Sequence, residues 1–224
     1  MYPYYILTSC HTKGDIPMDD LNHLNSTHFD ILKEIGNIGS GNGVTALSKI
    51  IGRKVRMKTP VVVLAEFKDV AAFLGGPEQL VIGILVGISG DINGIMMFLT
   101  KVGTARKMLE ILMGPAVPGA QDGEEFTGME LSALKEIGNI MASSYIGSLA
   151  GLIGKEVRPS VPYLSLDMAN AILSVPATEF GKSADRALLI ETLFEAEGEN
   201  VSGYCILAPD VTSFQIIMRS LGAE

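Results

Sequence analysis

The sequence is poor in the residues that build metal centres, disulfide frameworks and nucleic-acid interfaces. It has only two cysteines, Cys10 and Cys205, which lack any paired spacing, and it has three histidines and no tryptophan. These counts argue against a disulfide scaffold and a thiolate metal site, and they favour a reduced, cytoplasmic setting. With 17 Lys and Arg against 25 Asp and Glu, the net charge of -8 also argues against binding to nucleic acid or to anionic lipid.

Long apolar runs and a signal-peptide pattern are missing as well. The longest apolar candidate, Leu80–Gly90, contains three glycines and stops at Asp91, so we interpret it as a buried strand and expect no membrane insertion. The first residues have neither a basic start nor a long apolar core, which argues against a signal peptide. What remains is a chain of 224 residues, 47% of them hydrophobic, which is enough to bury a sizeable core.

An internal repeat organises most of the chain. The heptapeptide LKEIGNI occupies Leu32–Ile38 and recurs at Leu134–Ile140, and a gap-free alignment with further scattered identities extends as far as Pro60 and Pro162. Further along, and with an insertion in the second copy, GDINGIMMFLT in the first half resembles GENVSGYCILAP in the second. The chain therefore reads as a duplicated unit.

Each unit is predicted to contain a long helix, several strands and a short closing helix. One long helical segment (27–51) starts with the cap-type residues Ser26 and Thr27 and ends at Gly52. Its twin runs from about Thr127 to Ile153 and ends at Gly154. Runs rich in β-branched residues predict strands at 55–67, 79–89, 92–99, 161–175, 186–195 and 201–207. Amphipathic stretches at 102–113 and 211–221 predict the closing helices.

The predicted fold class is mixed α/β, with a duplicated, pseudo-twofold arrangement. Two long motif-bearing helices are expected to pack on a mostly antiparallel sheet system. We divide the chain into an N-terminal arm (1–26), a first repeat (27–113), a connector rich in Gly, Pro and acidic residues (114–126) and a second repeat (127–224). The two repeats are expected to form one compact domain.

The repeated helix carries a polar stripe. At about 100° per residue, Asp30, Glu34 and Asn37 fall within about 60° of one another, and Ser132, Glu136 and Asn139 do the same in the second copy. Isoleucines and leucines occupy the other sides, so the Glu and Asn side chains are expected to face outward.

From the sequence alone, two interpretations of this stripe remain: ordinary solvated surface residues or a functional site. A lone Glu and Asn on a helix are usually just solvated. Against this, the two copies have diverged at other positions, such as Gly43 and Tyr145, while both keep Glu and Asn. The glycine before each Asn, Gly36 or Gly138, either allows close packing inside the protein or leaves a bare spot for another protein's backbone.

The sequence lacks the residues that several other kinds of functional site require. The histidines, His11, His23 and His28, all precede the first motif, which leaves no zinc site or nucleophile–base pair in the body of the chain. The GNIGSGNG run at 36–43 lies within a helical pattern, unlike a phosphate-binding loop. An enzyme acting on a small metabolite is disfavoured because no cluster of titratable residues is visible.

The spacing of the two stripes matches a known signature. Asp30-Glu34-Asn37-Pro60 and Ser132-Glu136-Asn139-Pro162 resemble the motif of the CheC family of bacterial chemotaxis phosphatases, which includes CheC, CheX and FliY types. Two motifs in one chain are most like the CheC type. The resemblance implies a CheC-like fold and hydrolysis of the phospho-aspartate on the response regulator CheY, which terminates its signal.

The resemblance also implies roles for the motif residues. Asn37 and Asn139 would hold the attacking water, and Glu34 and Glu136 would pair with a lysine of the regulator. Asp30 and Ser132 would support the helix, and Pro60 and Pro162 would shape the entry to the following strand. No cofactor is expected in this chain, since the magnesium ion would belong to CheY.

The competing interpretation is a non-catalytic interaction protein. Such a chain would bind phosphorylated CheY without hydrolysing it, or would regulate the receptor deamidase CheD, a partner that the resemblance also implies. An asparagine at both positions favours catalysis, because binding alone has no need of it.

Overall fold

The structure is a computed structural model that describes residues 26–52, 54–58, 61–113, 125–180, 186–196 and 199–220. The predicted N-terminal arm, apart from Ser26, and most of the predicted connector lie outside these residues. So does Pro60, one of the motif positions.

The described residues form one antiparallel sheet of eight strands. Its order is β1-β7-β8-β4-β3-β5, with β2 also beside β7 and β6 also beside β3. The strands are β1 (Val55–Met57), β2 (Val61–Glu66), β3 (Leu80–Gly90), β4 (Gly94–Lys101), β5 (Val157–Pro159), β6 (Tyr163–Met168), β7 (Arg186–Ala196) and β8 (Glu199–Pro209).

The registers of the strand pairs follow a pseudo-twofold axis between β4 and β8. Met97 lies opposite Ile206, and the flanking pairs, Met96 with Leu207 and Phe98 with Cys205, exchange when the two repeats are interchanged. The first strands of each repeat pair with the other repeat: β1 and β2 with β7, and β5 and β6 with β3. Each half of the sheet is therefore completed by strands of the other repeat.

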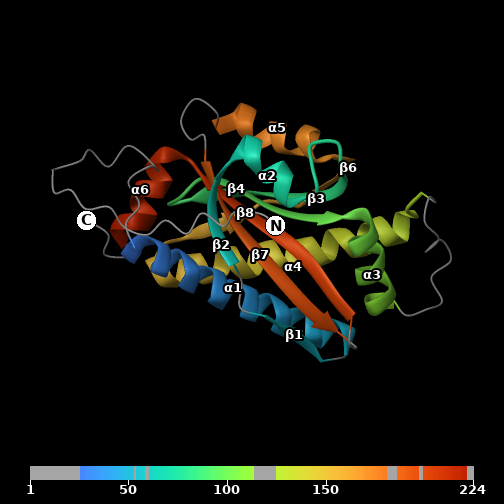
Figure 1. The fold of residues 1–224 in the computed structure, drawn as a ribbon. Coiled ribbons are helices and arrows are strands. Elements are labelled where there is room, and N and C mark those ends of the chain that lie inside the picture. The colour runs from blue at the N-terminus through green and yellow to red at the C-terminus, as the bar shows by residue number, and fades with distance from the viewer. Residues whose placement is uncertain are drawn as a thin grey trace.

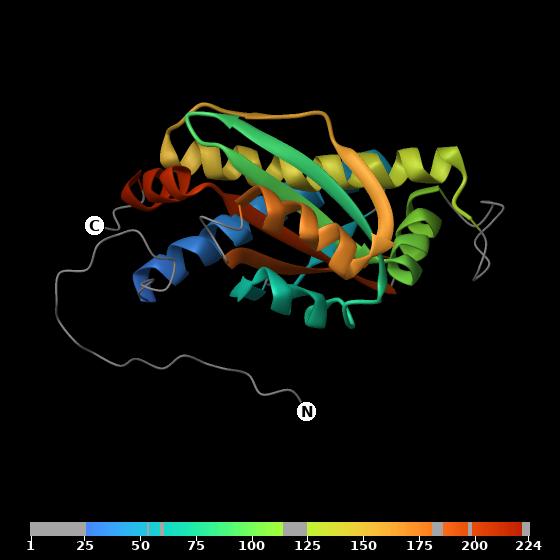
Figure 2. The ribbon, with the colours of Figure 1, turned by 90° about the horizontal axis from the view of Figure 1, so that it is seen from above.

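Helices cover both faces of this sheet (Figures 1 and 2). The larger core lies between the sheet and α1 (Ser26–Ile51), α3 (Val102–Met113), α4 (Gly128–Ile153) and α6 (Val211–Ser220). A smaller core lies under α2 (Phe67–Phe73) and α5 (Ala169–Phe180) on the opposite face. The α/β class and the two long helices on an antiparallel sheet are confirmed. None of the described helices is both long and apolar enough to cross a membrane.

The long helices begin and end close to the predicted residues. Thr127 caps α4: its hydroxyl accepts from the Glu130 backbone N–H, and the Glu130 carboxylate accepts from the Thr127 N–H. Gly154 ends α4 in a left-handed conformation, with φ 63°, and Gly52 follows α1 with φ 68°. These are conformations that glycine adopts at little cost, so the repeated glycines stop both helices at equivalent places.

Two of the predicted strands are partly wrong. The strand predicted at 161–175 ends at Met168, and α5 begins directly afterwards. Ala169, Ile172, Leu173 and Pro176 are buried, which is the i, i+3, i+4, i+7 spacing of one helix face. The strand predicted at 55–67 is likewise divided into β1 and β2, and Phe67 already belongs to α2. In the second repeat, the apolar residues on the buried face of α5 continue the apolar run of β6, so the end of the strand is hidden in the sequence.

Candidate functional site

The two motif helices pack against each other in antiparallel orientation (Figure 1). Gly39 of α1 lies under the ring of Tyr145 of α4, and Gly43 lies under Met141, whose Sδ would be 2.8 Å from an added Cβ. These two contacts are equivalent under the pseudo-twofold relation. A small residue on α1 thus receives a large one from α4 on each side of the crossing, which lets the helices approach closely.

A buried polar chain fixes the same crossing. The Ser40 and Tyr145 hydroxyls are hydrogen-bonded, and the Tyr145 hydroxyl also bonds the Cys205 thiol of β8. Burial raises the pKa of Cys205 well above its usual range, and the Tyr145 hydrogen bond opposes this only in part. Cys205 is therefore a neutral structural thiol and is unsuited to act as a nucleophile.

The first motif lies on the exposed side of α1. Asp30, Glu34 and Asn37 are all exposed, whereas Leu32 and Ile35 between them are buried against the sheet. Lys33 Nζ lies 3.8 Å from Asp30 Oδ1, and this pair is open to solvent. The predicted outward direction of this stripe is confirmed.

The second motif is similar in position and differs in detail. Ser132 and Glu136 are exposed, and Asn139 is half-buried. Ser132 Oγ donates to the Gly128 carbonyl at 2.8 Å, so it bonds its own helix in the first turn. Asn139 Oδ1 accepts from Ser143 Oγ at 3.5 Å, a contact that the sequence did not predict.

The structure keeps the two motifs apart. Asn37 lies two residues before Gly39, and Asn139 lies two residues before Met141, so the asparagines approach the crossing from opposite directions. Each is about 6 Å along its helix from the middle of the crossing, at about 1.5 Å per residue. Each helix therefore presents its own Glu and Asn, and neither set completes the other.

The glycine that precedes Asn139 is a packing residue. Gly138 is buried, and an added Cβ there would lie 2.7 Å from Ile84 Cβ on β3. Because Gly138 has no side chain, α4 lies directly on the sheet. The interpretation that this glycine leaves room for a partner protein's backbone is therefore wrong at this position. Gly36 is buried as well.

The turn that carries Pro162 joins β5 to β6 along the edge of β3. Ser160 holds this turn, because Gly87 N donates to Ser160 Oγ at 2.8 Å and Ser160 N donates to the Gly87 carbonyl at 2.9 Å. Pro162 is half-buried, and its ring fixes φ where the chain enters β6. Sequence reasoning missed Ser160, because a serine in a turn gives no distinctive signal.

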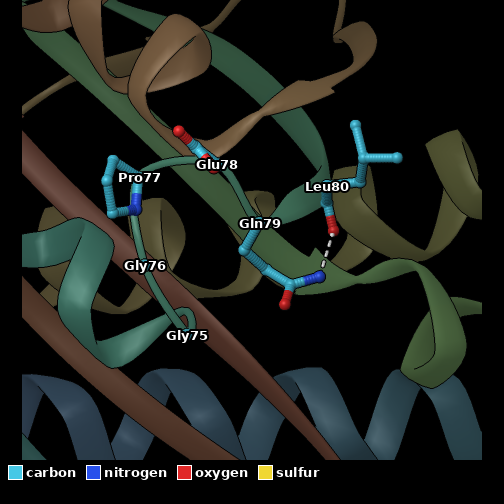
Figure 3. Close-up of a pocket in the computed structure, with 6 residues that line it drawn as sticks. All are labelled: Gly75, Gly76, Pro77, Glu78, Gln79 and Leu80. Carbon is cyan, nitrogen blue, oxygen red and sulfur yellow. Dashed lines mark hydrogen bonds between the residues drawn. The ribbon is translucent and has the colours of Figure 1, made fainter.

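Other parts of the described chain offer no competing centre. Its His, Cys, Asp and Glu residues form no group of three or more that could hold a metal ion. A shallow hollow lies in the loop between α2 and β3, where Gly75, Gly76, Pro77, Glu78, Gln79 and Leu80 line it (Figure 3). The Gln79 amide bonds the neighbouring Leu80 carbonyl, and no motif residue lies in this loop.

Comparison with known proteins places the chain in a family. The model of the CheC-like family matches residues 28–64 and 129–166, which include both motifs, most of α1 and α4, and much of the strands that follow them. The chain is 32% identical over 210 residues to the CheY-P phosphatase CheC of Bacillus subtilis, covering 92% of this chain and all of that protein. This protein belongs to the CheC-like family.

Two further likenesses agree with this assignment. The flagellar motor switch phosphatase FliY of Bacillus subtilis is 31% identical over 156 residues, covering 68% of this chain and 38% of FliY. The crystal structure of Thermotoga maritima FliY has the same fold, with a TM-score of 0.68 at 23% identity, covering 88% of this chain and 99% of that one.

Proposed function

We propose that this protein is a phospho-aspartyl phosphatase that hydrolyses the phosphorylated response regulator CheY and so terminates its signal. The observation that carries the proposal is the solvent-accessible pair of Glu and Asn side chains on each of two helices, in a chain that is 32% identical to a CheY-P phosphatase. The proposal includes the cytoplasmic location predicted from the sequence.

The asparagine carboxamide suits this reaction. Phosphoryl transfer to water passes through a loose, in-line transition state, which needs positioning and charge stabilisation more than covalent help. One amide offers an acceptor oxygen and a donor nitrogen, so Asn37 or Asn139 can fix both the position and the orientation of a water molecule. Exposure on a helix lets the side chain enter the active site of another protein.

The glutamates are assigned to recognition. Glu34 and Glu136 precede their asparagines by one turn and are exposed, so each can pair with a lysine of CheY while the amide reaches the phosphoryl group. Asp30 and Ser132 support the start of this surface, Asp30 by holding Lys33 and Ser132 by bonding the Gly128 carbonyl. Pro162 shapes the entry to β6, and the family resemblance implies the same role for Pro60, which lies outside the described residues.

Reversing the charge at Glu34 and Glu136 tests their assigned role in recognition. In the variant E34K/E136K, the dissociation constant for phosphorylated CheY is expected to rise about tenfold at low salt, because attraction becomes repulsion at each contact. The difference should shrink as salt rises, since the Debye length falls from about 30 Å at 0.01 M to about 3 Å at 1 M. Fluorescence titration across this range measures the effect.

The matched control is D69K/E78K. Asp69 and Glu78 are exposed residues of α2 and of the α2–β3 loop, outside both motifs. This variant changes the net charge by the same amount, so a general effect of charge would appear equally in both proteins. Equal salt dependence of the two variants would remove the lysine partner from the proposal.

Metal is expected to act only through the substrate. The proposal assigns magnesium to CheY and no cofactor to this chain. EDTA should therefore stop dephosphorylation, while the unfolding midpoint of the phosphatase alone stays unchanged with and without EDTA. A purified protein that contains one tightly held metal ion per chain in elemental analysis would contradict this assignment.

Phosphate release from CheY charged with acetyl phosphate tests the function itself. After acetyl phosphate is removed, catalytic amounts of the protein should accelerate the decay of phosphorylated CheY with multiple turnovers. Binding without acceleration would support the non-catalytic alternative, in which the protein sequesters CheY. Binding of the receptor deamidase CheD stays a prediction of the family resemblance, and titration of CheD with this protein measures it.

A further inference from the structure

The serine hydroxyls of α4 follow one pattern with a single exception among the described residues. Three of them donate to the backbone carbonyl four residues earlier: Ser132 to Gly128 at 2.8 Å, Ser144 to Ile140 at 2.7 Å and Ser148 to Ser144 at 2.7 Å. Ser143 Oγ instead donates to the side chain of Asn139, at 3.5 Å from Oδ1. Its hydroxyl is thus directed at the proposed catalytic amide.

This hydrogen bond constrains what the Asn139 amide can do. Oδ1 is the amide atom that faces Ser143 Oγ, so the Nδ2 donor group points away. Oδ1 keeps a second lone pair, and both Nδ2 protons stay available for a water molecule and for the phosphoryl group. The distance is long, as is usual for catalytic hydrogen bonds before the partner is bound.

The first motif has no residue at the equivalent position that could make the counterpart of the Ser143–Asn139 hydrogen bond. The position equivalent to Ser143 is Gly41, which has no side chain, and an added Cβ there would meet nothing within 4 Å. Asn37 is exposed, whereas Asn139 is half-buried. Both repeats therefore carry the same amide, and among the described residues a side-chain hydroxyl is hydrogen-bonded to the second amide only.

We propose that Ser143 is a positioning residue that orients the Asn139 carboxamide, and that the second site consequently turns over faster than the first. This inference rests on the proposed phosphatase function. An amide that is already oriented loses less rotational freedom when the transition state forms, so the advantage appears in kcat. Since one such hydrogen bond contributes modestly, we expect a difference of about three- to tenfold between the sites.

Ser143 is tested where only the second site works. In the N37A background, S143A should lower kcat for dephosphorylation of CheY about three- to tenfold and leave KM unchanged. S143T, which keeps the hydroxyl, should restore most of kcat. The matched control is S144A, which removes the adjacent hydroxyl of the same helix turn and should leave kcat unchanged, because the Ser144 hydroxyl bonds the Ile140 carbonyl and not the Asn139 amide.

The converse experiment adds the hydroxyl to the first site. In the N139A background, G41S should raise kcat severalfold, since the position has room for a side chain and serine is a better helix former than glycine. A gain of function is informative here because a damaged fold cannot produce it.

The outcomes separate this inference from the proposed function. Equal kcat values for S143A and S144A in the N37A background would overturn the positioning role while leaving the phosphatase intact. A rise in KM at constant kcat would overturn it too, since it would mark Ser143 as a contact for CheY. Failure of the unmodified protein to accelerate decay of phosphorylated CheY would remove the proposed function and this inference together.

Discussion

Replacing Asn37 and Asn139 together by Ala is expected to lower the rate of CheY dephosphorylation by about 10² to 10³, the range found when a group that stabilises a transition state is removed. Each motif is complete on its own helix, so either single variant should keep part of the activity. With Ser143 beside Asn139, N139A should lose more than N37A. Decay of phosphorylated CheY under multiple-turnover conditions measures all three variants.

The double variant also separates catalysis from sequestration. Both asparagines are solvent-accessible on helices whose buried faces are unchanged, so the unfolding midpoint should stay within a few degrees of the parent's. If the glutamates govern recognition, phosphorylated CheY should still bind. N170A, which removes an exposed asparagine from the first turn of α5, serves as the control. A folded double variant with parental rates would refute the role of the amides.

The fold could be predicted from the sequence where local signals were strong and repeated. Both long helices are followed by a glycine, and the duplication gives this signal twice, while Thr127 caps the start of α4. The exposed direction of Glu34 and Asn37 followed from helical periodicity, because the neighbouring residues Leu32 and Ile35 are apolar and lie on the opposite, buried side of the helix. These features depend only on neighbours in sequence.

The rest depended on contacts between distant residues. The strand exchange that pairs β2 with β7 and β6 with β3 has no local signature. The replacement of Gly43 in one copy by Tyr145 in the other looked like drift, whereas Tyr145 covers Gly39 across the helix crossing. The bond from Ser143 to Asn139 was equally hidden, since a helical serine usually bonds a backbone carbonyl.

The crossing of α1 and α4 yields the second large effect, on stability. G39M is expected to lower the free energy of unfolding by about 3 kcal/mol, because even the Cβ of a residue at this position would overlap the Tyr145 ring. Urea denaturation followed by circular dichroism measures the loss. G147A is the control: Gly147 is exposed on α4, an added Cβ there meets nothing within 4 Å, and the change should stabilise by about 0.5–1 kcal/mol.

The pseudo-twofold relation supplies the compensating change. Adding Y145G to G39M places a methionine on α1 opposite a glycine on α4. This arrangement is the pseudo-twofold equivalent of the Met141–Gly43 contact that the protein already contains. The double variant should therefore be less destabilised than the sum of its single changes, with a coupling of about 0.5–3 kcal/mol. Recovery should be incomplete, because Y145G also removes the hydroxyl that joins Ser40 to Cys205. If the losses in the free energy of unfolding were strictly additive, a methionine opposite a glycine would not pack equally well on both sides of the crossing.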